Sequence, residues 1–194
     1  MRSTSSRSWI IPVLIALVVL AILGFWFVGQ RNSLVTLEES VEAAWSEVDN
    51  ELQRRSDLIP NLVATVQGVT QQEQEVFGQI ADARARLAGA ETVAETSERY
   101  AELESAVSRL LVVVENYPEL RSNENFIRLQ DELAGTENRI AIARRRYNEA
   151  VQQFNTRIRV FPTNVAANQL GMTSKDYFEV SEEDREVPTV DFGD

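Results

Sequence analysis

Residues 48–87 read VDNELQRRSDLIPNLVATVQGVTQQEQEVFGQIADARARL, and their apolar side chains recur at alternating intervals of four and three residues. Ten of the twelve positions in this series are apolar, and the two exceptions are Arg55 and Glu73. This spacing draws one apolar stripe along a helix, whereas a half-buried strand would place apolar residues at every second position. The stretch therefore predicts a helix that packs its stripe against other helices.

Two later stretches repeat the same periodicity. Residues 100–117 are apolar at all six stripe positions, and residues 126–161 are apolar at nine of eleven. Proline follows both stretches, at Pro118 and Pro162, and we expect it to close both helices. Because no comparable stretch alternates with a period of two, the sequence predicts an all-α fold.

Residues 9–28, WIIPVLIALVVLAILGFWFV, contain no charged side chain. At about 1.5 Å per residue, a helix of this length spans the roughly 30 Å hydrocarbon core of a bilayer. A cleaved secretory signal has an apolar region of only about 7 to 15 residues and ends in small residues, whereas this stretch has Phe25, Trp26 and Phe27 near its end. The sequence therefore favours a retained transmembrane helix, with Trp9 and Trp26 near the two membrane surfaces.

Charge is distributed unevenly about this span. Arg2 and Arg7 precede it, whereas Arg31 is the one basic residue close behind it, so the positive-inside rule favours a cytoplasmic N-terminus and an exported C-terminal part at the cell (inner) membrane. The margin is small, and the opposite orientation stays open. The part of the chain after the span carries 17 basic and 30 acidic residues, a net charge of −13. So acidic a domain repels polyanions, and we expect no nucleic-acid partner.

The chain contains no histidine and no cysteine. This composition excludes disulfides, Cys/His zinc sites, cysteine and Ser-His-Asp nucleophiles, and a histidine that shuttles protons near neutral pH. Carboxylates remain, but the sequence lacks Gly-rich phosphate loops and the shaped acidic loop of a calcium site. We therefore predict no catalytic, cofactor-binding or metal-ligating residues and no cofactor.

The predicted helices differ in length, which leaves part of the first apolar stripe, from Leu34 to Leu52, without an evident cover. As one straight helix, residues 34–87 would be about 80 Å long, whereas the second helix would be only about 35 Å long. In one arrangement the chain breaks at Ser56-Asp57 and forms an antiparallel bundle of four helices, 34–57, 58–88, 93–116 and 123–161. In the other, Pro60 only kinks a long stalk, whose membrane-proximal stripe pairs with a second copy of the chain in a homo-oligomer.

Polar residues at stripe positions and one basic run are the candidate functional groups. Those at stripe positions are Arg55, Glu73, Thr136 and Arg157. They either set the register of helix packing or line a polar pocket, and we favour the first because buried charges must be paired. The run Arg144-Arg145-Arg146, with Arg139 upstream, either holds phosphate or pairs with acids of its own and neighbouring helices, and the acidity of the domain favours ion pairs.

The sequence accordingly divides into five parts. They are a short basic segment (1–8), the transmembrane helix (9–28), a helical-bundle domain (30–161), a C-terminal extension (162–180) and an acidic tail (181–194). The extension is polar, and we expect a last helical turn around residues 174–178. The tail has six acidic residues among its fourteen, a composition typical of disorder.

Two stretches resemble the LemA family of membrane-anchored helical proteins of bacteria. They are AWSEVDNELQRRSDLIPNLVATVQG (44–68) and ENYPELRSNENFIRLQDELAGTENRIAIARRRYNEAVQQFNTRIRVFP (115–162), the second followed by YFE at 177–179. The family pattern has a His-Glu pair where this chain has Gln72-Glu73, so no role that depends on that histidine operates here. The resemblance implies long antiparallel helices tethered by one N-terminal span, and it implies no catalytic residues.

The resemblance also implies a scaffold or adaptor role, because some relatives are tied to magnetosome membranes and others to envelope functions. We therefore hypothesise a non-enzymatic membrane-tethered scaffold at the bacterial cell envelope, which binds protein partners of unknown identity by helix-in-groove contacts. The alternative is an enzyme subunit or a carboxylate-dependent hydrolase acting at the membrane. The residues expected to specify the fold are Trp45, Arg55, Asp57, Pro60, Asn61, Glu137, Asn138, Arg139, Tyr147 and Asn148.

Overall fold

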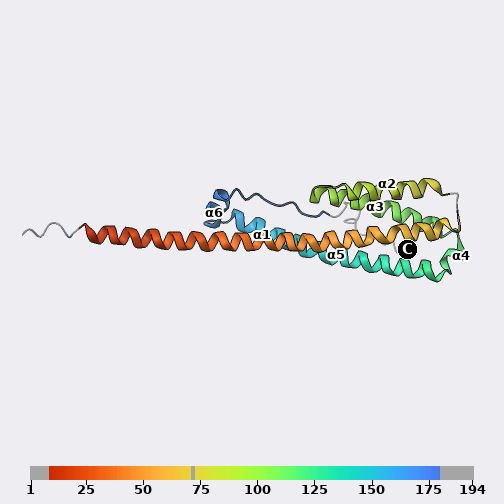
Figure 1. Ribbon diagram of the computed structural model, residues 1–194, viewed down its shortest axis with the longest axis horizontal. Coiled ribbons are helices and arrows are strands. Elements are labelled where there is room, and N and C mark those ends of the chain that lie inside the picture. Colours follow the sequence, from red (N-terminus) through yellow and green to blue (C-terminus); the bar gives the residue numbers. More distant parts are fainter. Residues whose placement is uncertain (1–8, 71–72, 180–194) are drawn as a thin grey trace, which may run out of the picture. The chain divides into compact units, whose positions relative to one another are not determined.

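A computed structural model of the chain describes residues 9–70 and 73–179 (Figure 1). The predicted N-terminal segment 1–8 and acidic tail 181–194 lie outside the described residues. Within them the chain forms helices and no strand, which confirms the predicted all-α class. The helices are α1 (Ile10–Gln67), α2 (Gln74–Ala88), α3 (Val93–Val114), α4 (Pro118–Arg121), α5 (Glu124–Arg159) and α6 (Thr163–Gln169).

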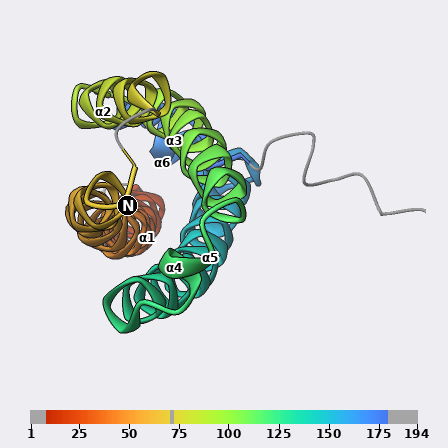
Figure 2. The same ribbon diagram turned by 90° about the vertical axis from the view of Figure 1, so that its right-hand side faces the viewer.

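The chain divides into two compact units. The first comprises Met1–Val41 and Gln152–Lys175, and the second comprises Glu42–Val151 and Asp176–Asp194. In the second unit α2 and α3 pack against each other after a short chain reversal, and Figure 2 shows α2, α3 and α5 on an arc beside α1. The predicted bundle of antiparallel helices behind a long N-terminal apolar helix is therefore confirmed.

Helix α1 runs without interruption from the apolar N-terminal stretch into the second unit. Among the described residues it is the one helix long and apolar enough to cross a membrane, and nothing in its most apolar window is buried. Pro60 lies inside α1, so the first of the two arrangements, in which the chain breaks at Ser56-Asp57, is wrong, and the helix is continuous as in the second. Ile59 and Leu62 beside it are fully buried, and their packing outweighs the backbone hydrogen bond that proline lacks.

Helix α1 ends at Gln67, about twenty residues before the end expected from the periodicity. Gly68 follows, and the N–H groups of Val69 and Thr70 both donate to the carbonyl oxygen of Val66 at 3.0 Å. Val69 thereby leaves the buried stripe and is 40% exposed. Glycine is a poor helix former, and it ends α1 although the apolar spacing continues. The next helix, α2, ends at Ala88, which is the end expected for the helix 58–88, and Gly89 is its C-cap.

Local capping explains the starts of α3 and α5. Thr92 and Glu95 form a reciprocal capping box, in which the backbone N–H of Glu95 donates to the Thr92 hydroxyl at 3.2 Å. The Asn123 side chain accepts hydrogen bonds from two N–H groups in the first turn of α5 and thereby caps this helix. Helix α3 ends at Val114, and Pro118 opens the short α4 instead of closing the preceding helix.

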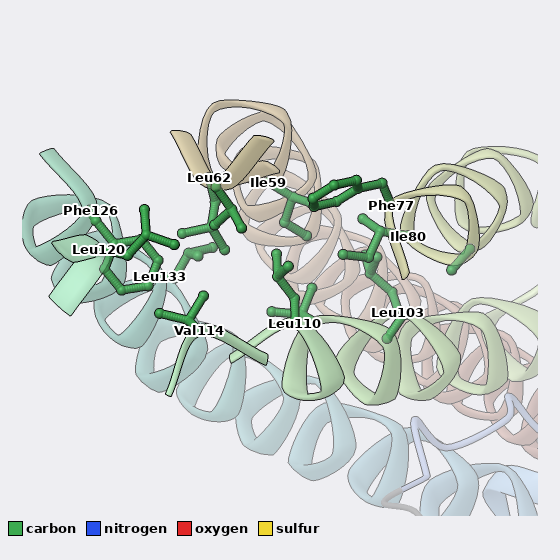
Figure 3. Close-up of a cluster of buried hydrophobic side chains, with 14 residues drawn as sticks. Ile59, Leu62, Phe77, Ile80, Leu103, Leu110, Val114, Leu120, Phe126 and Leu133 are labelled. Atoms are coloured by element: carbon green, nitrogen blue, oxygen red, sulfur yellow. The ribbon is translucent and has the colours of Figure 1, made fainter. Parts of the chain in front are cut away.

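One hydrophobic core in the second unit receives side chains from α1, α2, α3, α4 and α5. Figure 3 shows Ile59 and Leu62 of α1 facing Leu110 of α3, with Phe77 of α2 and Phe126 of α5 on either side. Each fully buried side chain of this size contributes about 1.5 to 3 kcal/mol relative to an exposed one. The core therefore holds the helices of this unit in place around the last third of α1.

The membrane-proximal part of the α1 stripe is covered by the chain itself. Leu34, Val41, Val48 and Leu52 are all buried, with exposed fractions of 0 to 4%. This stripe consequently presents no apolar surface to a second copy, and the expected stalk that self-associates through it is wrong. A homo-oligomer formed through another surface stays a prediction.

The C-terminal extension differs from expectation. Helix α6 occupies Thr163–Gln169 with Leu170 as its C-cap, and Gly171 follows with a φ of +68°, which suits glycine. Residues 174–178 are not helical. Within the first unit, the Asn155 side chain exchanges two hydrogen bonds of 2.9 Å with the backbone N–H and C=O of Lys175. These bonds satisfy the N–H and C=O of Lys175, which would otherwise be hydrogen-bonded within a helix. They explain why the predicted helical turn around residues 174–178 is absent.

We predict that a chain reduced to residues 30–194 stays folded and soluble. No residue in the most apolar window of the deleted part of α1 is buried, so its removal takes no side chain out of the core. Far-ultraviolet circular dichroism and gel filtration measure the result, and a chain reduced to residues 42–194, which loses buried Leu34 and Val41, serves as the destabilised comparison. Weak helical signal or aggregation of the 30–194 chain would contradict the fold described above.

Candidate functional site

Arg55 of α1 is the best-connected buried polar residue of the second unit. Its Nε and Nη2 atoms donate to the two carboxylate oxygens of Glu104 on α3, at 2.6 and 2.7 Å. Its Nη1 atom donates to the carbonyl oxygen of Leu133 at 2.7 Å and to the Thr136 hydroxyl at 3.2 Å, both on α5. One side chain thus ties three helices together, in the two-pronged geometry that guanidinium groups form with carboxylates.

A second carboxylate completes this Arg55 cluster. Glu137 of α5 lies 3.5 Å from Nη2 of Arg55 and accepts a hydrogen bond from the hydroxyl of Tyr100 on α3. Burial alone would lower the pKa of Arg55, but the hydrogen bond and charge of Glu104, with smaller contributions from Tyr100 and Glu137, raise it overall. Burial, followed by the charge of Glu104, raises the pKa of Tyr100. Both groups therefore keep their protons at neutral pH. The hydrogen bonds of Arg55 to groups on α3 and α5 fasten the three helices.

An aromatic cluster adjoins the Arg55 cluster in the second unit, because the Tyr100 ring lies 6.4 Å from the Phe178 ring between centroids. The Trp45 ring is 5.3 Å from the Tyr147 ring and 6.2 Å from the Phe178 ring, between centroids. The Tyr147 hydroxyl donates to the carbonyl oxygen of Asp176 at 2.8 Å, and burial, with a smaller contribution from the Asp176 charge, raises the pKa of Tyr147 to about 12. Asn148 exchanges two hydrogen bonds, of 3.0 and 2.9 Å, with the Phe178 backbone. These side chains hold the last described residues against α5.

An open groove of about 380 Å³ lies between α1, α2 and the start of α3. We call it the α1–α2 groove. Apolar lining comes from Leu52, Leu87 and alanines, and charge comes from Asp49, Asp57 and Arg84, whose Nε donates to the Ser56 hydroxyl at 3.3 Å. Its lining residues are Asp49, Leu52, Gln53, Ser56, Asp57, Arg84, Leu87, Ala88, Ala90 and Thr96.

Most of the residues expected to specify the fold lie in two adjoining clusters or at exposed positions. Arg55 and Glu137 meet in the Arg55 cluster, whereas Trp45, Tyr147 and Asn148 belong to the aromatic cluster. The exposed ones are Asp57 in the groove, Pro60 and Asn61 on α1, and Asn138 on α5. Periodicity did not point to Glu104, Arg84 or Thr96, since none of them occupies a stripe position.

The four polar residues at stripe positions differ in their burial and in their hydrogen-bond partners. Arg55 and Thr136 come together as a hydrogen-bonded pair, which supports the register-setting interpretation for these two. Glu73 is half-buried just before α2. In the first unit, Arg157 donates from Nη2 to the Gln30 side chain at 3.0 Å. The four therefore do not form a common polar pocket.

The basic run on α5 forms ion pairs with the neighbouring helix. Arg139 donates to Glu51 of α1 at 2.9 Å, and Arg146 donates to Glu47 of α1 at 3.2 Å. These contacts support the ion-pair interpretation for the two arginines. In residues 9–70 and 73–179, no three or more acidic side chains lie close enough together to hold a metal ion.

Comparisons with known proteins agree with the resemblance seen in the sequence. A sequence model of the LemA family matches residues 44–192. The chain is 26% identical to Protein LemA of Metamycoplasma hominis over 175 residues, which cover 89% of this chain and 80% of that relative. It is 25% identical to Magnetosome protein MamQ 2 of Paramagnetospirillum magneticum over 76% of this chain and 64% of the relative. The identity is 23% to Magnetosome protein MamQ of Magnetospirillum gryphiswaldense, over 87% and 72% of the two chains.

We predict that Arg55→Lys lowers the free energy of unfolding by about 2 kcal/mol, because lysine cannot reproduce the paired bonds to Glu104 and leaves buried acceptors unsatisfied. Arg54→Lys, at the exposed neighbouring position, is the matched control and should change it by less than about 0.5 kcal/mol. Denaturant unfolding followed by circular dichroism measures both. Equal stability of the two variants would show that the Arg55 cluster does not fasten the helices.

We also predict that Arg139→Glu destabilises the second unit by about 1 kcal/mol, since it places a like charge opposite Glu51 on a partly exposed surface. Arg145→Glu, at an exposed position of the same helix, should have a smaller effect. Melting temperatures of the two variants test this difference. Identical shifts would refute the assignment of Arg139 to an interhelical ion pair.

Proposed function

The chain belongs to the LemA family, and from this membership we propose that it is a non-enzymatic scaffold or adaptor tethered to the membrane at the bacterial cell envelope. The observation that carries the proposal is the continuity of α1, in which one helix supplies both the candidate membrane span and a core element of the helical bundle. Such a helix holds a folded surface at the membrane without adding chemistry. The MamQ relatives are named as magnetosome proteins, and their similarity supports a membrane role.

The α1–α2 groove is the surface we assign to partner binding. Its apolar lining offers area for a partner side chain. Asp49 and Asp57 in the lining, against Arg84, leave an acidic excess that favours a partner with basic residues. The net charge of −13 after the span strengthens this preference through longer-range attraction. We expect a basic and apolar protein segment as the partner, and no nucleic acid.

The bundle is proposed to lie on the exported side of the membrane. Arg2 and Arg7 before the span, against Arg31 after it, support a cytoplasmic N-terminus. Accordingly, we expect the partner in the envelope outside the cytoplasmic membrane.

The geometry of the groove gives little support to the alternative of a carboxylate-dependent hydrolase. Asp49 and Asp57 are eight residues apart on α1, which corresponds to about 12 Å along the helix axis. Carboxylate pairs of glycosidases, by comparison, are about 5 to 9.5 Å apart. Glu104 and Glu137, the two acids of the Arg55 cluster, both pair with Arg55.

Site-specific photo-crosslinking in native membranes tests the scaffold proposal. A photoreactive residue replaces Gln53 in the groove, and the control replaces Gln130, an exposed glutamine of α5 outside it. We expect one protein partner to be captured at position 53 and not at position 130. Ala88→Trp, which fills the groove, should abolish capture, whereas Ala85→Trp, an exposed alanine of α2 outside the groove lining, should not.

Two results would contradict this assignment. Equal capture at positions 53 and 130 would show that the groove does not select a partner. Capture that survives Ala88→Trp would place the binding surface elsewhere on the bundle.

A further inference from the structure

The corner between α5 and α6 exposes three apolar side chains, which we call the corner patch. Val160, Phe161 and Val165 are 49, 76 and 53% exposed. The opposite face of α6 is buried, with Thr163 and Ala166 almost inaccessible to solvent. Helix α6 thus packs one face within the chain, and its other face continues an apolar surface that the described residues leave uncovered.

Hydrogen bonds locate this corner along α1. The Gln30 side-chain oxygen accepts from the Thr163 hydroxyl and from Nη2 of Arg157, both at 3.0 Å. All three residues belong to the first unit, as does the apolar stretch 10–28. Figure 1 shows α6 beside α1 at this level. Gln30 follows Val28 by two residues, so the corner is fastened about 3 Å beyond the end of the apolar stretch.

This position places the corner patch in the headgroup layer of the bilayer. A bilayer is about 40 to 45 Å thick with its headgroups and about 30 Å without them, which leaves about 5 to 8 Å of headgroup layer on each side. A corner held about 3 Å beyond the hydrocarbon core therefore lies inside that layer. Aromatic and aliphatic side chains are stable there, and exposed Arg31 and Arg159 near the same corner can extend their charges toward lipid phosphates.

We propose that the corner patch is a second membrane contact, at which Val160, Phe161 and Val165 enter the boundary between headgroups and acyl chains on the side where α1 leaves the bilayer. The occupant of the patch is the lipid surface itself. A span alone leaves α1 free to tilt in any direction, whereas a lipid contact on one side of the helix favours tilt toward that side. The contact stands independently of the scaffold role, because it requires only that α1 cross the membrane.

Spin labelling tests this contact directly, because the chain has no cysteine of its own. A nitroxide is attached to Val165→Cys in the full chain, reconstituted in phosphatidylcholine vesicles. Its collisions with oxygen, which concentrates in lipid, are compared with its collisions with a water-soluble nickel chelate. The matched control is Val112→Cys, at another exposed valine, which lies on α3 and is 62% exposed. Circular dichroism verifies that both variants fold.

We expect the label at position 165 to favour oxygen severalfold over the nickel chelate, relative to the label at position 112. A further Phe161→Ser change should raise the nickel collisions at position 165, because it removes the most exposed apolar side chain of the patch. Equal nickel accessibility at positions 165 and 112 would overturn the proposal, as would protection from both reagents, which would mean that protein covers the patch. An unchanged result after Phe161→Ser would also overturn it.

Discussion

A single apolar stripe along α1 constrains the rest of the structure. Leu34, Val48, Ile59, Leu62 and Val66 are all fully buried on this helix, and the same helix continues N-terminally into the apolar stretch that can cross a membrane. The other helices of the second unit are placed by the part of the stripe that they cover, with α2, α3, α4 and α5 all contributing to the core around Ile59. A change that broke α1 would therefore separate the core from the membrane span as well as disturb the packing.

Periodicity predicted the helices well, because it records which side chains are buried once a helix exists. It did not predict the end of α1 at Gln67, since Val69 and Glu73 keep the expected spacing although Gly68 has already ended the helix. Periodicity could not predict the structure of the C-terminal extension either, for a different reason. Its backbone is held by the side chain of Asn155, within the first unit, and by that of Asn148, within the second, and hydrogen bonds between residues twenty or thirty positions apart leave no periodic trace.

The candidate site shows the same division between what local sequence reveals and what tertiary structure adds. Arg55 and Thr136 stand out as polar residues on an apolar stripe, and the structure pairs them. Glu104, which binds Arg55 most closely, resembles any exposed acid of a helix until α1 and α3 are packed. The hydrogen bonds of Arg55 to groups on α3 and α5 make this cluster a rigid link between the helices. This rigidity, the groove beside it and the acidic charge agree with a scaffold that presents a fixed surface.

One continuous helix, α1, forms both the candidate membrane span and the core helix of the second unit. Hydrogen–deuterium exchange of the full chain in lipid nanodiscs, followed at the backbone amides of residues 27–36, tests this continuity most directly. A continuous helix predicts slow exchange across Gly29, Gln30 and Arg31, because each of these amides is hydrogen-bonded within α1. Rapid exchange confined to these residues, with slow exchange on both sides, would reveal a hinge at the membrane surface and contradict the account.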